Sequence, residues 1–129
     1  HRKLSGDVPT EYHHTPEPEQ NDEIVSGLRP HSLVMNSTGL GKDAPGSPIT
    51  DAATFPERGL AWDFNYRGDL LFLQQARTQQ AERKLTIEDG WVYFLHGWLR
   101  VIEEVFHIDI PNAGPAFDEL SEIAKEVRR

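Results

Sequence analysis

Short apolar runs alternate with longer amphipathic runs along this chain. The short runs predict strands at residues 8–13, 31–36, 60–66 and 85–88. The longer runs predict helices at residues 19–28, 69–84, 90–106 and 115–127. Such alternation is typical of βαβ units, whose strands are parallel. We therefore expect an α/β fold with a parallel sheet of about four strands, flanking helices and a C-terminal helical pair.

Several segments carry expectations about burial and order. The run at residues 31–36 is apolar between turn residues, which is typical of a strand buried on both faces. The helix at residues 90–106 is apolar around most of its circumference, which predicts burial against several neighbours. Residues 39–59 are rich in glycine and proline and predict a long functional loop with one helical turn at residues 51–54. Residues 1–18 predict an irregular segment, broken by the short strand, at the start of a single domain spanning residues 1–129.

The composition is that of a soluble globular domain. A length of 129 residues, with 37% hydrophobic and 26% charged residues, allows one core of ordinary size. A formal net charge of -8 without a basic cluster makes nucleic acid a poor partner. The absence of cysteine excludes disulfides, and the histidines lack the spacing of a metal site. Because no apolar run reaches the roughly 20 residues that span a bilayer, we expect a cytoplasmic protein without a membrane partner.

Polar and glycine-containing motifs follow three of the predicted strands. They are N-S-T-G-L-G at residues 36–41, D-F-N-Y at residues 63–66, and D-G at residues 89–90, which opens the aromatic-rich helix. In parallel α/β sheets, ligands bind at the carboxyl ends of the strands, where these motifs lie. In order and spacing, across about residues 31–110, the motifs resemble the cofactor domain of shikimate dehydrogenases and the related quinate/shikimate dehydrogenases.

The resemblance implies an NADP- or NAD-dependent oxidoreductase of aromatic amino acid biosynthesis. This chain would be the C-terminal part of its cofactor domain, with a partial Rossmann-like sheet. The residues that would line the cofactor, carried over by motif, are Ser37, Thr38, Gly39, Phe64, Gly90 and Tyr93. Tyr66 would border the substrate, a cyclic hydroxy acid such as shikimate or quinate.

One departure from the family concerns substrate binding. The family commonly has a glutamine that binds a substrate hydroxyl at the position of Gly97, and His96 precedes this position. We hypothesise that His96 replaces the missing glutamine as a hydrogen-bonding group. An unchanged Michaelis constant of the intact enzyme after His96→Ala would remove this hypothesis.

A larger departure is the absence of parts that a dehydrogenase needs. The chain has no G-x-G-x-x-G turn, which would bring the cofactor pyrophosphate to a helix N-terminus. The catalytic lysine and aspartate of the family would lie upstream, so we expect no catalytic residue here and no activity of the isolated chain. We expect it to bind the missing N-terminal part or to form a homo-oligomer.

Other interpretations of the same residues remain open. The chain could be a non-catalytic remnant or interaction module that pairs with another chain through an exposed sheet edge. It could also be a small-molecule binding domain with its ligand in the loop at residues 39–59. Asp63 could act as a base, although at a strand end it more simply accepts backbone hydrogen bonds. The helix aromatics could be core residues, namely Trp91, Tyr93, Phe94 and Trp98.

Overall fold

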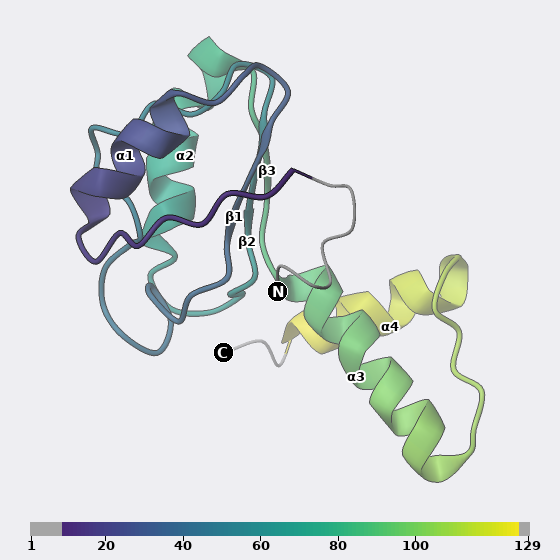
Figure 1. Cartoon of the computed structure of the whole chain (residues 1–129). Coiled ribbons are helices and arrows are strands. Elements are labelled where there is room, and N and C mark those ends of the chain that lie inside the picture. The colour runs from purple at the N-terminus through teal and green to yellow at the C-terminus, as the bar shows by residue number, and fades with distance from the viewer. Residues whose placement is uncertain (1–8, 127–129) are drawn as a thin grey trace.

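The computed structural model describes residues 9–126 and shows an α/β fold (Figure 1). The elements are α1 (Pro18–Ser26), β1 (Leu33–Asn36), β2 (Leu60–Asp63), α2 (Leu71–Arg83), β3 (Thr86–Glu88), α3 (Trp91–Phe106) and α4 (Pro115–Glu126). The strands form one parallel sheet in the order β1-β2-β3. The predicted parallel α/β class and its C-terminal helical pair are confirmed. Within residues 9–126, no helix has both the length and the apolar character required to cross a bilayer.

One face of the sheet is covered by α1 and α2 (Figure 1). Val34, Ala61 and Ile87 lie side by side in the strand register, so their side chains point to one face. Ala61 is fully buried, and the other two pack against the core. That core consists of Val25, Ile49, Ala53, Phe55, Ala61, Phe72, Leu73, Ala76 and Leu85. This core therefore lies between the sheet and the two helices that cover one of its faces.

The opposite face of β1 is open. Leu33 and Met35 point to this face and are 49% and 45% exposed. The prediction that residues 31–36 are buried on both faces is therefore wrong. An apolar run indicates that a strand can be buried, but it does not supply the second layer that buries it. Among residues 9–126, β1 is also an edge strand, because it pairs with β2 on one side only.

The sheet has three strands within the described residues, where about four were predicted. Residues 9–13 form no strand, and residue 8 lies outside the described residues. β2 ends at Asp63, earlier than the predicted residue 66. The cause is the Asp63 carboxylate, which accepts a hydrogen bond from the Asn65 backbone N–H at 2.8 Å and so competes with continuation of the ladder. The predicted helical turn at residues 51–54 is a non-helical turn.

α3 extends away from the sheet beyond the carboxyl end of β3 (Figure 1). Its buried residues are Trp91, Leu95 and Leu99, which recur at helical spacing along one side. α4 lies against this helix, and the His96 and Phe117 rings stack with centroids 4.5 Å apart. The predicted burial of α3 against several neighbours is wrong, because apolar side chains on its other side are half exposed or more.

Candidate functional site

The carboxyl ends of β1 and β2 are joined by two buried polar side chains. Asn36, the last residue of β1, donates a hydrogen bond from Nδ2 to Oδ2 of Asp63, the last residue of β2, at 3.0 Å. The register places these two residues side by side, and they are 1% and 0% exposed. Because buried polar groups are costly unless they are hydrogen-bonded, this pair fixes both strand ends.

The loops that follow β1 and β2 are fastened to the same pair. The Asn36 Oδ1 accepts hydrogen bonds from the backbone N–H and the hydroxyl of Thr38, at 3.0 and 2.7 Å. Asn65 donates from Nδ2 to the Thr38 carbonyl at 3.0 Å and to the Leu40 carbonyl at 3.3 Å. Backbone at two of the predicted motifs is thus held together by amide side chains.

The start of α3 is packed directly against the end of β2. The Gly90 N–H donates to the Asn65 carbonyl at 3.0 Å. A Cβ atom on Gly90 would lie 1.9 Å from the Phe64 carbonyl oxygen, so only glycine fits at this position. This contact gives the glycine a structural role that requires no ligand.

An aromatic group lies beside this junction. The rings of Phe64 and Tyr93 stack with centroids 4.9 Å apart and planes at 8°. The Trp62 ring meets both of them edge-to-face, at 4.6 and 6.1 Å, and its Nε1 donates to the Asp89 carbonyl at 3.2 Å. An open hollow of about 300 Å³ adjoins the group and is lined by Trp62, Glu88, Asp89, Val92, Tyr93 and His96. Flat apolar rings and two carboxylates therefore border the same space.

Asp63 serves as an acceptor within the fold. Burial raises the pKa of its carboxyl group, and the nearby Asp89 carboxylate adds to this, while hydrogen bonds from Asn65 and Asn36 act in the opposite direction. Both of its oxygens accept hydrogen bonds from within the chain, and the residue is 0% exposed. The simpler of the two interpretations of Asp63 is confirmed, since a base must reach its substrate.

The predicted cofactor residues lie in and around this junction. Phe64, Gly90 and Tyr93 are in direct contact, and Thr38 is tied to them through Asn65. Ser37 and Gly39 flank Thr38 and are exposed. The Gly39 carbonyl accepts from the N–H groups of residues 42–44, so this part of the loop is a tight turn. The structure thus brings the three motifs to one edge of the sheet.

The two predicted substrate residues lie apart from each other. Tyr66 belongs to a second aromatic group, with its ring 4.3 Å from Phe94 and 5.5 Å from Trp91. His96 stacks on Phe117 of α4 and lines the hollow beside Tyr93. Sequence reasoning did not select Trp62 or Asn65. The available signal was a polar or aromatic residue at the end of an apolar run, but their partners lie about 25 residues away in the chain.

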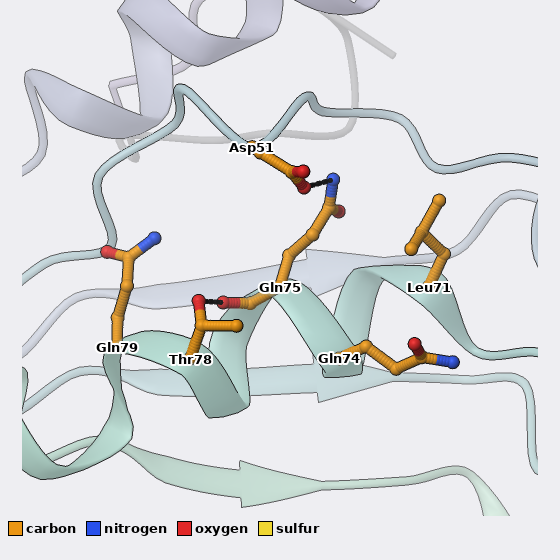
Figure 2. A pocket seen from close by; sticks show the side chains of 6 residues that line it. All are labelled: Asp51, Leu71, Gln74, Gln75, Thr78 and Gln79. Carbon is orange, nitrogen blue, oxygen red and sulfur yellow. Dashed lines mark hydrogen bonds between the residues drawn. The ribbon is translucent and has the colours of Figure 1, made fainter.

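A second hollow, of about 310 Å³, lies between α2 and the loop at residues 49–54 (Figure 2). Its polar groups hold that loop in place. Gln75 donates from Nε2 to the Asp51 carboxylate at 3.0 Å and to the Ile49 carbonyl at 3.2 Å. Gln79 donates to the Ala53 carbonyl at 2.8 Å. These glutamines take the place of the backbone hydrogen bonds that the predicted helical turn would have made. None of the predicted site residues lines this hollow.

The hollow beside Tyr93 is bordered by aromatic rings on one side and by Glu88 and Asp89 on the other. A nicotinamide ring placed in this hollow would be bordered by the Trp62 and Tyr93 rings. A glycine-rich turn that leads into a helix and holds a pyrophosphate is absent from the described residues. The same residues contain no group of three His, Asp or Glu side chains arranged to hold a metal ion. Comparisons of the chain with protein-family models, curated proteins and solved structures find no match.

Proposed function

We propose that this chain forms the nicotinamide side of the cofactor site in a shikimate- or quinate-dehydrogenase-like oxidoreductase. The observation that supports this most directly is the joined carboxyl edge. Three separate motifs meet there, and the Trp62 and Tyr93 rings border an open hollow, with Phe64 stacked on Tyr93. Ligands of parallel α/β sheets bind at this edge. The enzyme would be cytoplasmic and would transfer hydride between NAD(P) and a cyclic hydroxy acid.

The role of the chain in such an enzyme is positioning. Hydride transfer requires the two reacting carbons to be held close and aligned, and rigid walls contribute to this. The buried Asn36–Asp63 pair and the Asn65 amide make the wall rigid. The pyrophosphate turn and the proton-transferring lysine and aspartate would come from an upstream part. The isolated chain would therefore bind NAD(P)H weakly and turn over no substrate.

The test begins with the reading frame upstream of the His1 codon. A continuous frame of roughly 150 residues or more would be expressed with this chain, and NAD(P) reduction followed with shikimate and quinate. Tyr93→Ala removes one ring of the stack and is expected to raise the KM for the cofactor about tenfold, equivalent to about 1.4 kcal/mol. Ile123→Ala is the control, since Ile123 is 61% exposed on α4 and does not line this hollow. A start codon directly before His1, or no hydride transfer by the longer protein, would overturn the proposal.

An interaction module that pairs through β1 is the second candidate, supported by the free edge of the sheet. The carbonyls of Ser32 and Asn36 accept hydrogen bonds from the N–H groups of Leu60 and Phe64 at 3.1 and 3.0 Å, so the backbone groups of Leu33 and Met35 point to the free edge. The strand L-V-M-N has no lysine or proline that would discourage pairing.

Amide hydrogen exchange tests this second candidate. In the free chain, the Leu33 and Met35 amides are expected to exchange fast and the Val34 amide slowly. Strand pairing at higher protein concentration, or with a completing chain, would protect the Leu33 and Met35 amides. Fast exchange of these two amides under every condition would rule out pairing through this edge.

A further inference from the structure

An uninterrupted apolar stripe runs along the outer side of α3. It consists of Phe94, Trp98, Val101 and Val105, which follow at spacings of four, three and four residues. This is the heptad spacing that places side chains along one seam of a helix pair. Trp98, Val101 and Val105 are 54%, 50% and 63% exposed. The stripe therefore lies about a quarter turn around the helix from the buried residues Trp91, Leu95 and Leu99.

Gly97 opens a hole in the middle of this stripe. Phe94, Gly97, Trp98 and Val101 occupy positions i, i+3, i+4 and i+7, the four corners that receive one side chain of a facing helix. Together with Tyr93 they line an apolar hollow of about 340 Å³. A Cβ atom on Gly97 would meet nothing within 4 Å in this chain. Glycine disfavours a helix interior, so its presence here is explained if another helix approaches at this point.

We propose that α3 pairs antiparallel with α3 of a second copy and that the chain is a homodimer through this stripe. In an antiparallel pair of helices, a residue at heptad position a faces a residue at heptad position d of the partner helix. Trp98 then lies opposite Val101 of the second copy, and Phe94 lies opposite Val105 of the second copy. Each layer combines a large ring with a small valine. A parallel pair would set Trp98 against Trp98, leave the valine layers underfilled, and align the two helix dipoles unfavourably.

The area of the stripe fits a second copy. With Tyr93, which lines the same hollow, and Ile108, which are 56% and 49% exposed, the stripe offers roughly 500 Å² of apolar surface per copy. Two copies would bury roughly 1,000 Å², enough for a specific interface at the weak end of the range. The charges beside the stripe are already paired, since Arg100 forms ion pairs with Glu103 and Glu104 of its own helix. No unpaired charge need enter the seam.

The decisive measurement is the mass of the chain in solution, by sedimentation equilibrium, for the wild type and two variants. Val101→Glu places a charge in the seam and is expected to weaken dimerisation at least 100-fold. Val92→Glu is the matched control, because Val92 is 51% exposed and lies nine residues earlier, on the opposite side of the same helix. The wild type and Val92→Glu are expected to dimerise at micromolar concentrations. Added salt should strengthen the dimer, because each copy carries a net charge of -8.

A cross-linking experiment fixes the direction of the pair. The chain has no cysteine, so Phe94→Cys with Val105→Cys introduces the only two thiols. An antiparallel pair joins position 94 to position 105 of the second copy, and trypsin cleavage at Arg100 separates the two sites for identification. Links of 94 to 94 would overturn the antiparallel register. A monomeric wild type, or equal loss in both glutamate variants with unchanged circular dichroism, would overturn the dimer itself. The inference does not use the cofactor proposal, and either can fail alone.

Discussion

Gly90→Ala is the substitution for which the structure gives the clearest expectation. The added Cβ would lie 1.9 Å from the Phe64 carbonyl oxygen and 2.4 Å from the carbonyl carbon. Ordinary contacts begin at about 3.4 Å, so the α3 start and the β2 end must separate by about 1.5 Å. The atoms in contact are backbone and cannot rotate away. Gly90 has φ -81° and ψ 4°, which alanine also adopts, so the effect comes from the contact alone.

The magnitude follows from two contributions. Overpacking in a fixed environment costs about 1–3 kcal/mol, and backbone contacts belong at the upper end. A separation of this size also breaks the hydrogen bond from the Gly90 N–H to the Asn65 carbonyl, worth about 1 kcal/mol. We expect a loss of about 3–4 kcal/mol in the free energy of unfolding, a large fraction of the 5–15 kcal/mol of a typical domain.

The assay is urea unfolding followed by circular dichroism, with Gly97→Ala as the control on the same helix. Gly97 has no neighbour within 4 Å of its added Cβ, so alanine there should stabilise α3 by up to about 1 kcal/mol. Both substitutions would be measured in the Val101→Glu background, where association does not contribute. A loss below about 1 kcal/mol for Gly90→Ala, or equal effects of the two alanines, would refute the packing of α3 against β2.

Three further predictions concern the core, a buried carboxyl and a loop. Phe72→Ala, at a residue 2% exposed with its ring 5.5 Å from that of Phe55, should cost about 3–5 kcal/mol in urea unfolding. Burial raises the pKa of the Asp63 carboxyl group above the ordinary value of 3.8. The contribution of this group to the free energy of unfolding is therefore complete below pH 3.8 and is lost as the pH rises through the pKa of the folded state. The Asp63 ¹³C resonance should titrate above pH 3.8, and a midpoint below 3.8 would contradict this. Asp22→Ala removes two hydrogen bonds that Thr50 donates, and it should lower the free energy of unfolding by about 2–3 kcal/mol in thermal unfolding. Glu23→Ala, at the adjacent exposed residue, is the control and should lower it by less than about 0.5 kcal/mol.

The sequence predicts the order of the elements well because each carries its own pattern. The apolar runs and the helical spacings specify strands and helices locally, and short connections between them require parallel pairing. The end of β2 was misplaced because Asp63, Phe64 and Asn65 continue the strand pattern in composition. The Asp63 side chain, bound to the Asn65 N–H, decides the boundary. An alternating apolar and polar pattern does not reveal where a side chain will compete with the backbone for hydrogen bonds.

Burial was predicted less well than secondary structure. The apolar residues of β1 and α3 were expected to be covered, yet Leu33, Met35, Trp98 and Val105 are about half exposed or more. A hydrophobic pattern reports which side chains favour burial, and the neighbours available to the chain decide which of them achieve it. Within residues 9–126, β1 and α3 are each covered by other residues on one side only.

The candidate site was predicted in its location and only partly in its composition. Motifs at strand ends pointed to the carboxyl edge, where Phe64, Gly90 and Tyr93 do meet. The buried amides that hold this edge, Asn36 and Asn65, bond to partners more than 20 residues away, at Asp63 and Thr38. Sequence spacing carries no information on such partners until the strand register is known.

The two exposed apolar surfaces, β1 and the stripe on α3, would bind different kinds of partner. In the described part of the chain, β1 is a free edge of the sheet and offers backbone hydrogen-bonding groups, so it can pair with a further strand. The stripe on α3 follows β3 at the other edge and offers side chains at heptad spacing, so it is satisfied by a helix. A chain that completed the sheet beside β1 would leave the stripe uncovered, and a helix on the stripe would leave the edge unpaired. If the Leu33 amide is protected at high protein concentration both in the wild type and in Val101→Glu, while Val101→Glu no longer dimerises, the two surfaces act independently. Loss of both together would mean that one interface, formed across α3, also orders the edge strand.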